Sequence, residues 1–331
     1  MDPSATDYWE SRGLTSDFST IMPDAKTIIV AVYPYQPFNQ TISQGQGRYS
    51  AHYQAYPKGR EAMKELGAIL ADEGYEIVVD SPIPAKRLSY QSSLGKYGKN
   101  GLVYHPKFGS FITLHTMLTN AELKWDTLEC DKMDTVEMSD CGTCTRCIDT
   151  CPTQAIADDG IILVSKCMRF HMGSPEIIPI EIRGKMGDRM LGCEECQLVC
   201  PKNSKLTHIK ESTEESKKVF NIRAILANAL TGLKKLMNPI AQTVGNNYAR
   251  PQKVLSMAVI VAGNSGDQSY VPLLAETLQY PNEVIRAHSA WAIGKLGGEE
   301  AKTALINAEV KEGNIAVRNE IKLALEFIEL H

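Results

Sequence analysis

The sequence predicts a multidomain α+β protein, with a mixed region of strands and helices first, a cysteine-rich segment next and helical repeats last. Three observations support this architecture. Apolar patterns of strand and helix length alternate from Lys26 to about Asn120, all nine cysteines fall between residues 130 and 200, and the last 80 residues repeat with a period of 32. A chain of 331 residues is long enough for two or three hydrophobic cores. The domain boundaries that we expect are 1–125, 126–210 and 211–331.

The first region has the pattern of an α/β domain. Residues 60–74 space their apolar side chains at helical intervals and close on Gly74, where a helix would end. Short runs rich in β-branched residues have the length of strands. These runs lie at residues 27–33, 75–80, 101–105 and 110–118. The first two runs and the helix between them form a strand, helix, strand unit.

The cysteine-rich segment contains two related motifs. The first has the spacing C-x2-C-x2-C-x3-C-P, which is that of bacterial ferredoxins with two clusters, where the fourth cysteine binds the other cluster. The second repeats the ending C-x2-C-x3-C-P but separates its first cysteine by a long insertion. The first motif comprises Cys141, Cys144, Cys147, Cys151 and Pro152, and the second comprises Cys167, Cys193, Cys196 and Cys200.

Eight such cysteines predict a ferredoxin-like domain with two [4Fe-4S] clusters. Two residues between ligands let successive thiolates face different irons of one cube, and the three-residue step before proline carries the fourth thiolate to the neighbouring cluster. The expected sets are Cys141, Cys144, Cys147 and Cys200 for the first cluster, and Cys151, Cys167, Cys193 and Cys196 for the second. Two structural zinc sites are the alternative, because C-x2-C pairs often bind zinc. Cys130 is left over and is expected to be a free thiol.

Composition and the N-terminal segment exclude several classes of protein. The start, MDPSATDYWE, lacks the basic flank and apolar core of a secretion signal. The apolar runs fall short of the ~20 residues that cross a bilayer. Nine cysteines without a secretion signal favour metal or redox chemistry over a disulfide framework. We therefore expect a cytoplasmic protein with no membrane span.

The C-terminal region repeats with a period that is typical of stacked helix pairs. Aligning the segment from Ala258 with the segment from Ala290 places Gly266 over Gly298, and Arg286 lies 32 residues before Arg318. Such a period predicts a short solenoid of the HEAT type. With two or three units, the array is expected to pack on the preceding domain.

Seven segments spread over most of the chain carry a family resemblance. They are, in order, PDAKTIIVAVYPY, GRY, VVDSPIPAKR, GKYGKNGLVYHPKFGSF, CGTCTRCIDTCPTQAI, IRGKMGDRMLGCEECQLVCP and VAGNSGD. These segments resemble those of the cobalamin-dependent epoxyqueuosine reductases, which act in tRNA modification. That family has an N-terminal corrinoid-binding α/β domain, a two-cluster ferredoxin-like domain and C-terminal HEAT-like repeats that contact tRNA. The resemblance implies the same three parts here.

The resemblance also implies a reaction and its residues. The two clusters would pass electrons from an external low-potential donor to a cobalamin, and reduced cobalt would open the epoxide of epoxyqueuosine to give the alkene and water. Asp80 matches the family's acidic residue and would donate the proton, although a turn residue at a strand end is the other interpretation. Tyr97, Lys99 and Asn100 match a loop near the corrinoid, and a glycine-rich turn would explain that loop equally well.

The resemblance implies that the anticodon stem-loop of tRNA binds to basic residues of the repeats. The candidates are Arg250, Lys253, Arg286 and Arg318. Residues 201–331 carry 16 Lys and Arg against 13 Asp and Glu, a surplus that a solvated helical surface explains as well. Arg286 and Arg318 occupy equivalent repeat positions, where arginines often pair with carboxylates of the same chain.

The sequence departs from the family pattern at several positions, and these departures bear on the substrate. Lys86 and Arg87 stand where the family usually shows Glu-Arg, and Lys202 stands where it usually shows Trp. The Asp-Tyr-His element of the first domain is not evident, and no D-x-H-x-x-G sequence supports a histidine ligand on cobalt. Two alternatives therefore stay open: a related corrinoid iron-sulfur reductase with a small-molecule substrate, and an electron-carrier or corrinoid-handling protein.

Overall fold

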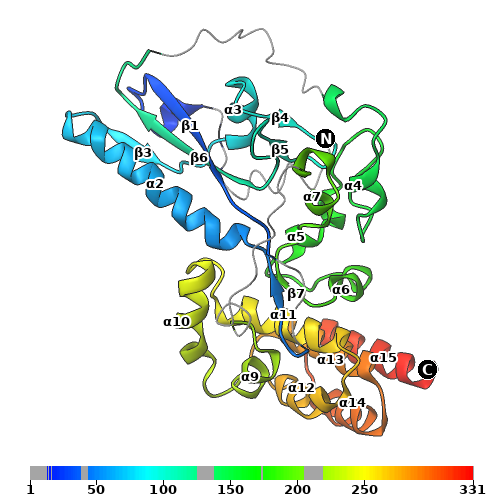
Figure 1. Cartoon of the computed structure of the whole chain (residues 1–331). Coiled ribbons are helices and arrows are strands. Elements are labelled where there is room, and N and C mark those ends of the chain that lie inside the picture. The colour runs from blue at the N-terminus through cyan, green and yellow to red at the C-terminus, as the bar shows by residue number, and fades with distance from the viewer. Residues whose placement is uncertain are drawn as a thin grey trace. The chain divides into compact units, whose positions relative to one another are not determined.

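The computed structural model describes residues 13, 15, 17–38, 44–124, 138–172, 174–204 and 219–330, which form two compact units (Figure 1). We call the first the sheet unit and the second the repeat unit. The sheet unit comprises Met1–Phe38, Ala51–Cys167 and Glu194–Lys210, and the repeat unit comprises Asn39–Ser50, Met168–Cys193 and Glu211–His331. Cys130 lies outside the described residues, so its expected free thiol stays a prediction, as do the three domain boundaries.

A three-stranded antiparallel sheet forms the centre of the sheet unit (Figure 1). Its strands are β1 (Thr27–Pro34), β6 (Ile112–Thr119) and β3 (Ile77–Val79), in the order β1-β6-β3. Both outer strands pair with β6, and Thr119 is the register partner of Thr27 on one side and Ile77 on the other. Because β6 is central, seven of its eight residues are buried.

The long helix α2 (His52–Asp72) packs against this sheet. It begins eight residues before the predicted helix and continues through Pro57. Two glycines let it approach the strands closely. A Cβ atom at Gly59 would collide with the ring of His115, and one at Gly67 would lie 2.6 Å from Ile77 Cδ1. The glycines of α2 thus make room for side chains of the sheet.

Short elements complete the sheet unit and carry the cysteine motifs. The strands β4 and β5 form a hairpin, which we call the β4–β5 hairpin. The elements are the 3-10 helix Phe18–Thr20, α3 (Ala85–Gln91), β4 (Lys96–Tyr97), β5 (Val103–Tyr104), α4 (Arg146–Asp149), α7 (Glu195–Leu198), and the 3-10 helices Ser139–Cys141, Val164–Lys166 and Pro201–Asn203.

The repeat unit begins with a small parallel strand pair and short helices. Its strands are β2 (Arg48–Tyr49) and β7 (Arg189–Leu191). Its early helices are α5 (Met168–His171), α6 (Ile180–Met186), α9 (Ile222–Ala227) and α10 (Leu233–Val244). Asn221 caps α9, because its side chain accepts a hydrogen bond from the N–H of Ala224 at 2.8 Å.

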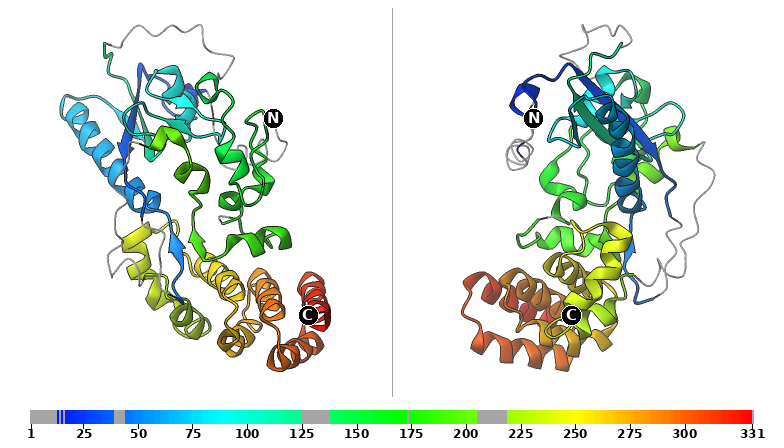
Figure 2. Two further views of the ribbon diagram at one scale, coloured as in Figure 1. Left: turned by 45° about the vertical axis from the view of Figure 1, so that its right-hand side comes forward. Right: turned by 90° about the vertical axis from the view of Figure 1, so that its left-hand side faces the viewer.

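Five helices and one 3-10 turn form the repeats, shown in two further views in Figure 2. They are α11 (Pro251–Asn264), the 3-10 helix Gln268–Tyr270, α12 (Val271–Thr277), α13 (Glu283–Leu296), α14 (Glu299–Lys311) and α15 (Ile315–Leu330). Helices α11, α13 and α15 start 32 residues apart and pack in succession, as the sequence period predicts. Gly263 and Gly294 permit this close packing, because a Cβ at either position would crowd an alanine of the next helix.

None of the described helices is both long and apolar enough to cross a bilayer.

Candidate functional site

The eight motif cysteines are partly buried free thiols on short, tightly turned segments. Cys147 lies on α4 and Cys196 on α7, while the others lie in turns or at helix ends. Seven of the eight belong to the sheet unit, and Cys193 directly precedes its last segment. The short helices therefore present several thiols over a small stretch of chain, as a cluster-binding segment requires.

Four of these thiols are electrostatic neighbours. Burial raises the pKa of Cys147, and the nearby thiolates of Cys200, Cys141 and Cys144 raise it further. Burial also raises the pKa of Cys200, and Cys141 and Cys144 act on it in the same direction. The last cysteine of the second motif thus lies with the first three of the first motif. This arrangement supports the first expected ligand set, which stays a prediction.

The β4–β5 hairpin contacts the cysteine segments through residues that the sequence assigned to the corrinoid. Lys99 Nζ donates hydrogen bonds to the carbonyl oxygens of Gly142 at 2.8 Å and Cys144 at 3.3 Å. Asn100 Nδ2 donates to the carbonyl oxygen of Cys196 at 3.3 Å. Both residues therefore brace the segments that carry the thiols, and their contact with a corrinoid stays a prediction.

A carboxylate with three polar or cationic neighbours lies directly before Cys141. Asp140 accepts a hydrogen bond from the Tyr104 hydroxyl at 2.6 Å and pairs with Lys96 Nζ at 3.1 Å. The bond from Tyr104, followed by that from Lys96, lowers the pKa of Asp140, and the charge of Lys202 adds to the effect. Sequence reasoning missed this group, because Asp140 is 36 residues or more from each of these partners.

Asp80 follows β3 and combines burial with an uncommon backbone conformation. Its φ is +54°, and its side chain is only 9% exposed. Oδ1 lies 3.3 Å from His115 Nδ1, and Oδ2 forms an ion pair with Arg60 Nε at 3.4 Å. Oδ2 has no hydrogen-bond partner among the described residues. Such a backbone costs about 1–3 kcal/mol, and together with a buried oxygen that lacks a hydrogen bond it marks Asp80 as a candidate functional residue.

His115 was not singled out by the sequence, but it is the closest titratable neighbour of Asp80. Its side chain is 1% exposed and lies on the central strand β6. Nε2 lies 2.9 Å from the hydroxyl of Thr113, and the ring of Tyr56 lies 4.8 Å from the imidazole. Because β6 is buried on both faces, its sequence shows no alternation that would reveal a polar residue with a role.

Several groups near the end of β3 and on the hairpin could bind a polar ligand such as a corrinoid with amide side chains. Asp80 Oδ2 and Ser81 Oγ are buried and lack hydrogen-bond partners in the described chain. Burial raises the pKa of Tyr97 to about 12, although Arg87 acts against it, so its hydroxyl keeps its proton at neutral pH. These donors and acceptors fit such a group.

The four basic candidates on the repeats differ in their surroundings. Arg286 forms a bidentate pair with Glu312 and also donates to the carbonyl oxygens of Tyr280 and Pro281, so the expected intramolecular pairing is present. Arg250 and Arg318 are exposed, and Lys253 is half-buried. The RNA-contacting role of all four stays a prediction.

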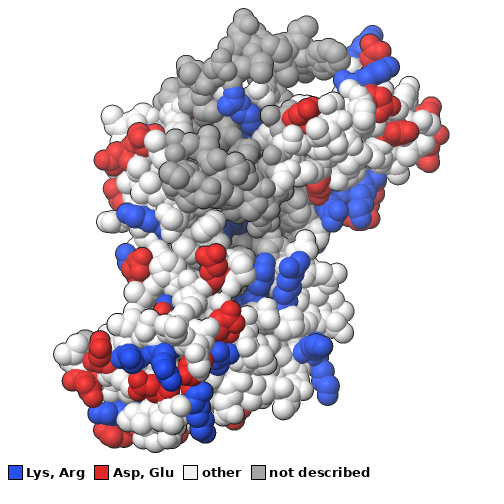
Figure 3. Space-filling view, turned by 180° about the vertical axis from the view of Figure 1, so that it is seen from behind, with Lys and Arg blue, Asp and Glu red and all other residues white. Residues whose placement is uncertain are grey.

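A stretch of the repeat unit that contains Arg250 and Lys253 is free of acidic residues. Residues 219–253 contain five Lys and Arg and no Asp or Glu, whereas residues 254–330 contain six Lys and Arg and ten Asp and Glu. In Figure 3, acidic residues are few on the side that carries α9 and α10, where Arg223 lies near Asp267, and both signs mix on the side of α13 to α15. Lys234 and Lys235, both exposed on α10, belong to this basic stretch and were missed by sequence reasoning.

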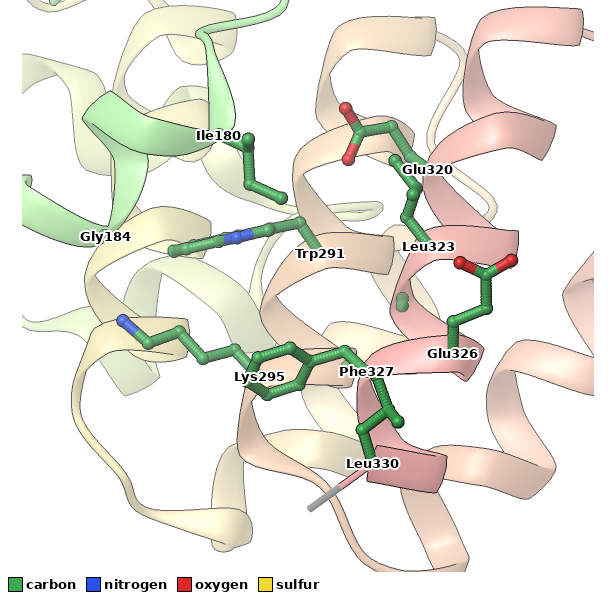
Figure 4. Close-up of a pocket in the computed structure, with 11 residues that line it drawn as sticks. Ile180, Gly184, Trp291, Lys295, Glu320, Leu323, Glu326, Phe327 and Leu330 are labelled. Atoms are coloured by element: carbon green, nitrogen blue, oxygen red, sulfur yellow. The ribbon is translucent and has the colours of Figure 1, made fainter.

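An apolar pocket of about 370 Å³ lies in the repeat unit between α6, α13 and α15 (Figure 4). Trp291, Leu323 and Phe327 line it, together with the charged side chains of Lys295, Glu320 and Glu326. Glu320 binds the guanidinium of Arg183 through both oxygens. None of the motif cysteines and no residue near Asp80 lines this pocket, so its size does not mark the candidate site.

Comparison with known sequence families confirms two parts of the predicted architecture. The profile of a 4Fe-4S double cluster binding domain matches residues 140–203, which include all eight motif cysteines. The profile of HEAT repeats matches residues 247–326. The chain therefore carries a double-cluster domain rather than a pair of zinc sites, followed by HEAT repeats.

Similar proteins include several epoxyqueuosine reductases. That of Bacillus cereus is 28% identical over 323 residues, which cover 93% of this chain and 82% of the relative. An uncharacterized protein in the gldA 3' region of Geobacillus stearothermophilus is 30% identical over 226 residues, 67% of this chain and 99% of that protein. The chain is thus similar over most of its length to epoxyqueuosine reductases.

Solved structures of epoxyqueuosine reductases have the same fold. A crystal structure of epoxyqueuosine reductase with an epoxyqueuosine-modified tRNA-Tyr stem-loop aligns with a TM-score of 0.76 at 25% identity, covering 98% of this chain and 91% of that chain. The Streptococcus thermophilus enzyme aligns with a TM-score of 0.74 at 21% identity, covering 98% and 90% of the two chains. The mixed sheet and helix architecture is thus that of epoxyqueuosine reductases.

Proposed function

We propose that this protein is a cobalamin-dependent reductase that converts epoxyqueuosine in tRNA to queuosine. The observation that carries the proposal is Asp80. This buried carboxylate has a left-handed backbone conformation and one oxygen without a hydrogen bond among the described residues, and it lies in the same unit as most of the motif thiols. Similarity to epoxyqueuosine reductases and the double-cluster domain support the same assignment.

The thiols supply the electron path in this proposal. Cys141, Cys144, Cys147 and Cys200 hold the first [4Fe-4S] cluster, and Cys151, Cys167, Cys193 and Cys196 hold the second. Cobalamin, when bound, supplies a reduced cobalt centre that is able to open an epoxide. Asp80, Ser81 and Tyr97 contribute hydrogen-bonding groups on the side where it would bind.

Asp80 supplies a proton in this proposal. Reduction of an epoxide to an alkene takes two electrons and two protons, and the epoxide oxygen leaves as water. A carboxylic acid at Oδ2 can protonate that oxygen, whereas Oδ1 faces His115. Burial of the side chain keeps bulk water away from the step, and Arg60 holds the carboxylate from its other side.

The partner in this proposal is the anticodon stem-loop of tRNA. A structure of an epoxyqueuosine reductase with an epoxyqueuosine-modified tRNA-Tyr stem-loop supports it. The groups that would contact phosphates are the cations of residues 219–253, which include Arg250 and Lys253, and the exposed Arg318. Arg286 is committed to Glu312 and is the least available of the basic candidates.

The test is turnover by protein reconstituted without oxygen. The full chain is loaded with iron, sulfide and cobalamin, supplied with a low-potential chemical reductant, and incubated with tRNA that contains epoxyqueuosine. We expect about eight iron atoms per chain and a nucleoside product that has lost one oxygen by mass spectrometry. Asp80→Asn should keep the iron and cobalamin content but turn over ~100-fold more slowly.

The outcomes separate the proposal from its alternatives. Cobalamin binding without binding of the stem-loop would overturn the tRNA assignment and favour a small-molecule reductase. Protein that contains iron but binds no cobalamin would favour the interpretation as an electron carrier. Full turnover by Asp80→Asn would remove Asp80 from the reaction.

A further inference from the structure

We propose that His115 is a positioning residue for Asp80: it holds Oδ1 so that Oδ2 is the oxygen that delivers the proton. This inference rests on the proposed function, because it assigns a task within that reaction. It concerns residues of α2, β6 and the turn after β3, all within the sheet unit.

Both nitrogens of the His115 ring have hydrogen-bond partners. In the proposed arrangement Nδ1 of His115 donates to Oδ1 of Asp80 across 3.3 Å, a bond that Oδ1 can also accept when the proton of the carboxyl group is on Oδ2. Nε2 lies 2.9 Å from the hydroxyl oxygen of Thr113, and that hydroxyl also donates to the carbonyl oxygen of Tyr33 at 3.4 Å. Both ring nitrogens are therefore occupied, and the ring cannot turn without breaking a bond.

The two oxygens of Asp80 have different surroundings as a consequence. Oδ1 is engaged by His115, whereas Oδ2 has the longer ionic contact with Arg60 and no hydrogen bond within the described part of the chain. The backbone of Asp80 is fixed as well, because its N–H donates to the carbonyl oxygen of Thr116 at 2.8 Å. The side chain is thus oriented from β6, and one oxygen is left for a reactant.

Packing on α2 holds the His115 ring in place. A Cβ atom at Gly59 would collide with Nε2 of His115 and lie 2.8 Å from Cδ2, so glycine alone leaves room for the ring there. Tyr56, one turn earlier, covers the imidazole. Glycine in a helix interior weakens the helix relative to alanine, and the space for His115 is a physical reason to keep it.

Two amide substitutions separate the two ring nitrogens. His115→Asn places an N–H donor near the position of Nδ1 and can still reach Asp80, whereas His115→Gln places its amide near Nε2 and can still reach Thr113. We expect kcat to fall by about 100-fold in His115→Gln with little change in KM, and to be largely retained in His115→Asn. Equal losses in both variants, or no loss in either, would overturn the proposal.

A pair of glycine substitutions tests the same geometry without changing a polar group. Gly59→Ala should displace the ring and lower kcat, while KM and iron content stay as in the wild type. Gly67→Ala is the matched control, because it lies on the same helix and crowds Ile77 and Met117 instead of His115. A kcat that falls equally in both variants would assign the effect to helix packing and refute the role of His115.

A spectroscopic measurement tests the hydrogen bond between His115 and Asp80, the His115–Asp80 dyad, independently of turnover. In full-length protein labelled with 15N-histidine, we expect a slowly exchanging Nδ1–H proton that is absent in His115→Asn and shifted in Asp80→Asn. If wild-type protein fails to reduce epoxyqueuosine yet shows this signal, the proposed function fails and the dyad stands. If the signal is absent from wild type or indifferent to Asp80→Asn, the dyad itself is refuted.

Discussion

At the scale of single residues, two buried histidines serve different ends. His288 on α13 is 0% exposed; its Nε2 accepts from the N–H of Ile178 at 3.0 Å, so Nδ1 carries the proton and faces Ser256 Oγ at 2.9 Å. Both partners are neutral groups of the fold. His115, by contrast, is hydrogen-bonded to a carboxylate whose other oxygen has no hydrogen bond among the described residues. The partner, rather than burial, distinguishes the histidine with a proposed role in the reaction from the structural one.

The structural histidine predicts a pH dependence of stability. Burial, followed by the charge of Arg183, lowers the pKa of His288 to about 3 from an ordinary 6.5. The unfolded chain therefore binds a proton at His288 below about pH 6.5, whereas the folded chain does not bind it until about pH 3. The free energy of unfolding consequently falls as the pH decreases through this window. Each pH unit contributes up to about 1.4 kcal/mol.

Urea unfolding of the full chain followed by circular dichroism at pH 7.5, 6.5, 5.5 and 5.0 measures this effect. His288→Gln keeps a polar side chain but does not titrate, so its midpoint should vary less with pH than that of the wild type. Parallel pH profiles for the two proteins would contradict the assignment.

At the scale of elements, the β4–β5 hairpin links the sheet to the cluster-binding segments. Lys99 brings a positive charge to the carbonyl oxygens of Gly142 and Cys144, and Lys96 balances Asp140 beside Cys141. Cluster potentials depend on net charge and hydrogen bonding around the sulfurs. The hairpin is therefore placed to set the potential of the first cluster as well as its position.

Opposite changes of charge on these segments should move that potential in opposite directions. Reduction adds negative charge to a cluster, so Lys99→Gln should lower the midpoint potential and Asp140→Asn should raise it. Redox titration followed by electron paramagnetic resonance measures both. Lys64→Gln, which removes a charge from an exposed pair with Glu61 on α2, is the control. Shifts of the same sign in Lys99→Gln and Asp140→Asn would contradict this account.

The elements also define how much the sequence could predict. Periodicity and ligand spacing are local signals, so the 32-residue helix period and the double-cluster motif were readable before the structure. The contacts of Lys99 and Asn100 were not, because they join residues 43 to 96 positions apart. His115 was hidden for a related reason: a central strand is buried on both faces and shows no polar alternation.

At the scale of the whole molecule, net charge conceals the distribution that matters for RNA. The formal charge is −4, yet residues 219–253 carry five cations and no carboxylate, whereas acidic residues outnumber basic ones in the helices that follow. Lys and Arg in a stretch with few carboxylates are the residues most suited to contact phosphates, and such contacts depend strongly on salt. Binding should therefore be concentrated on α10 and the start of α11.

Salt-dependent binding of an anticodon stem-loop tests this distribution. Lys234→Ala/Lys235→Ala should weaken binding and reduce the slope of log Kd against log salt by about 0.7 to 0.9 for each phosphate that is no longer neutralised, because fewer counterions are released. Lys302→Ala/Lys322→Ala removes the same charge from α14 and α15, where carboxylates are abundant. This double variant should change neither the Kd nor the slope of log Kd against log salt. Fluorescence anisotropy at three or more salt concentrations gives both quantities. If the two double variants weaken binding equally, the effect is one of net charge, and the basic stretch is not the RNA-binding surface.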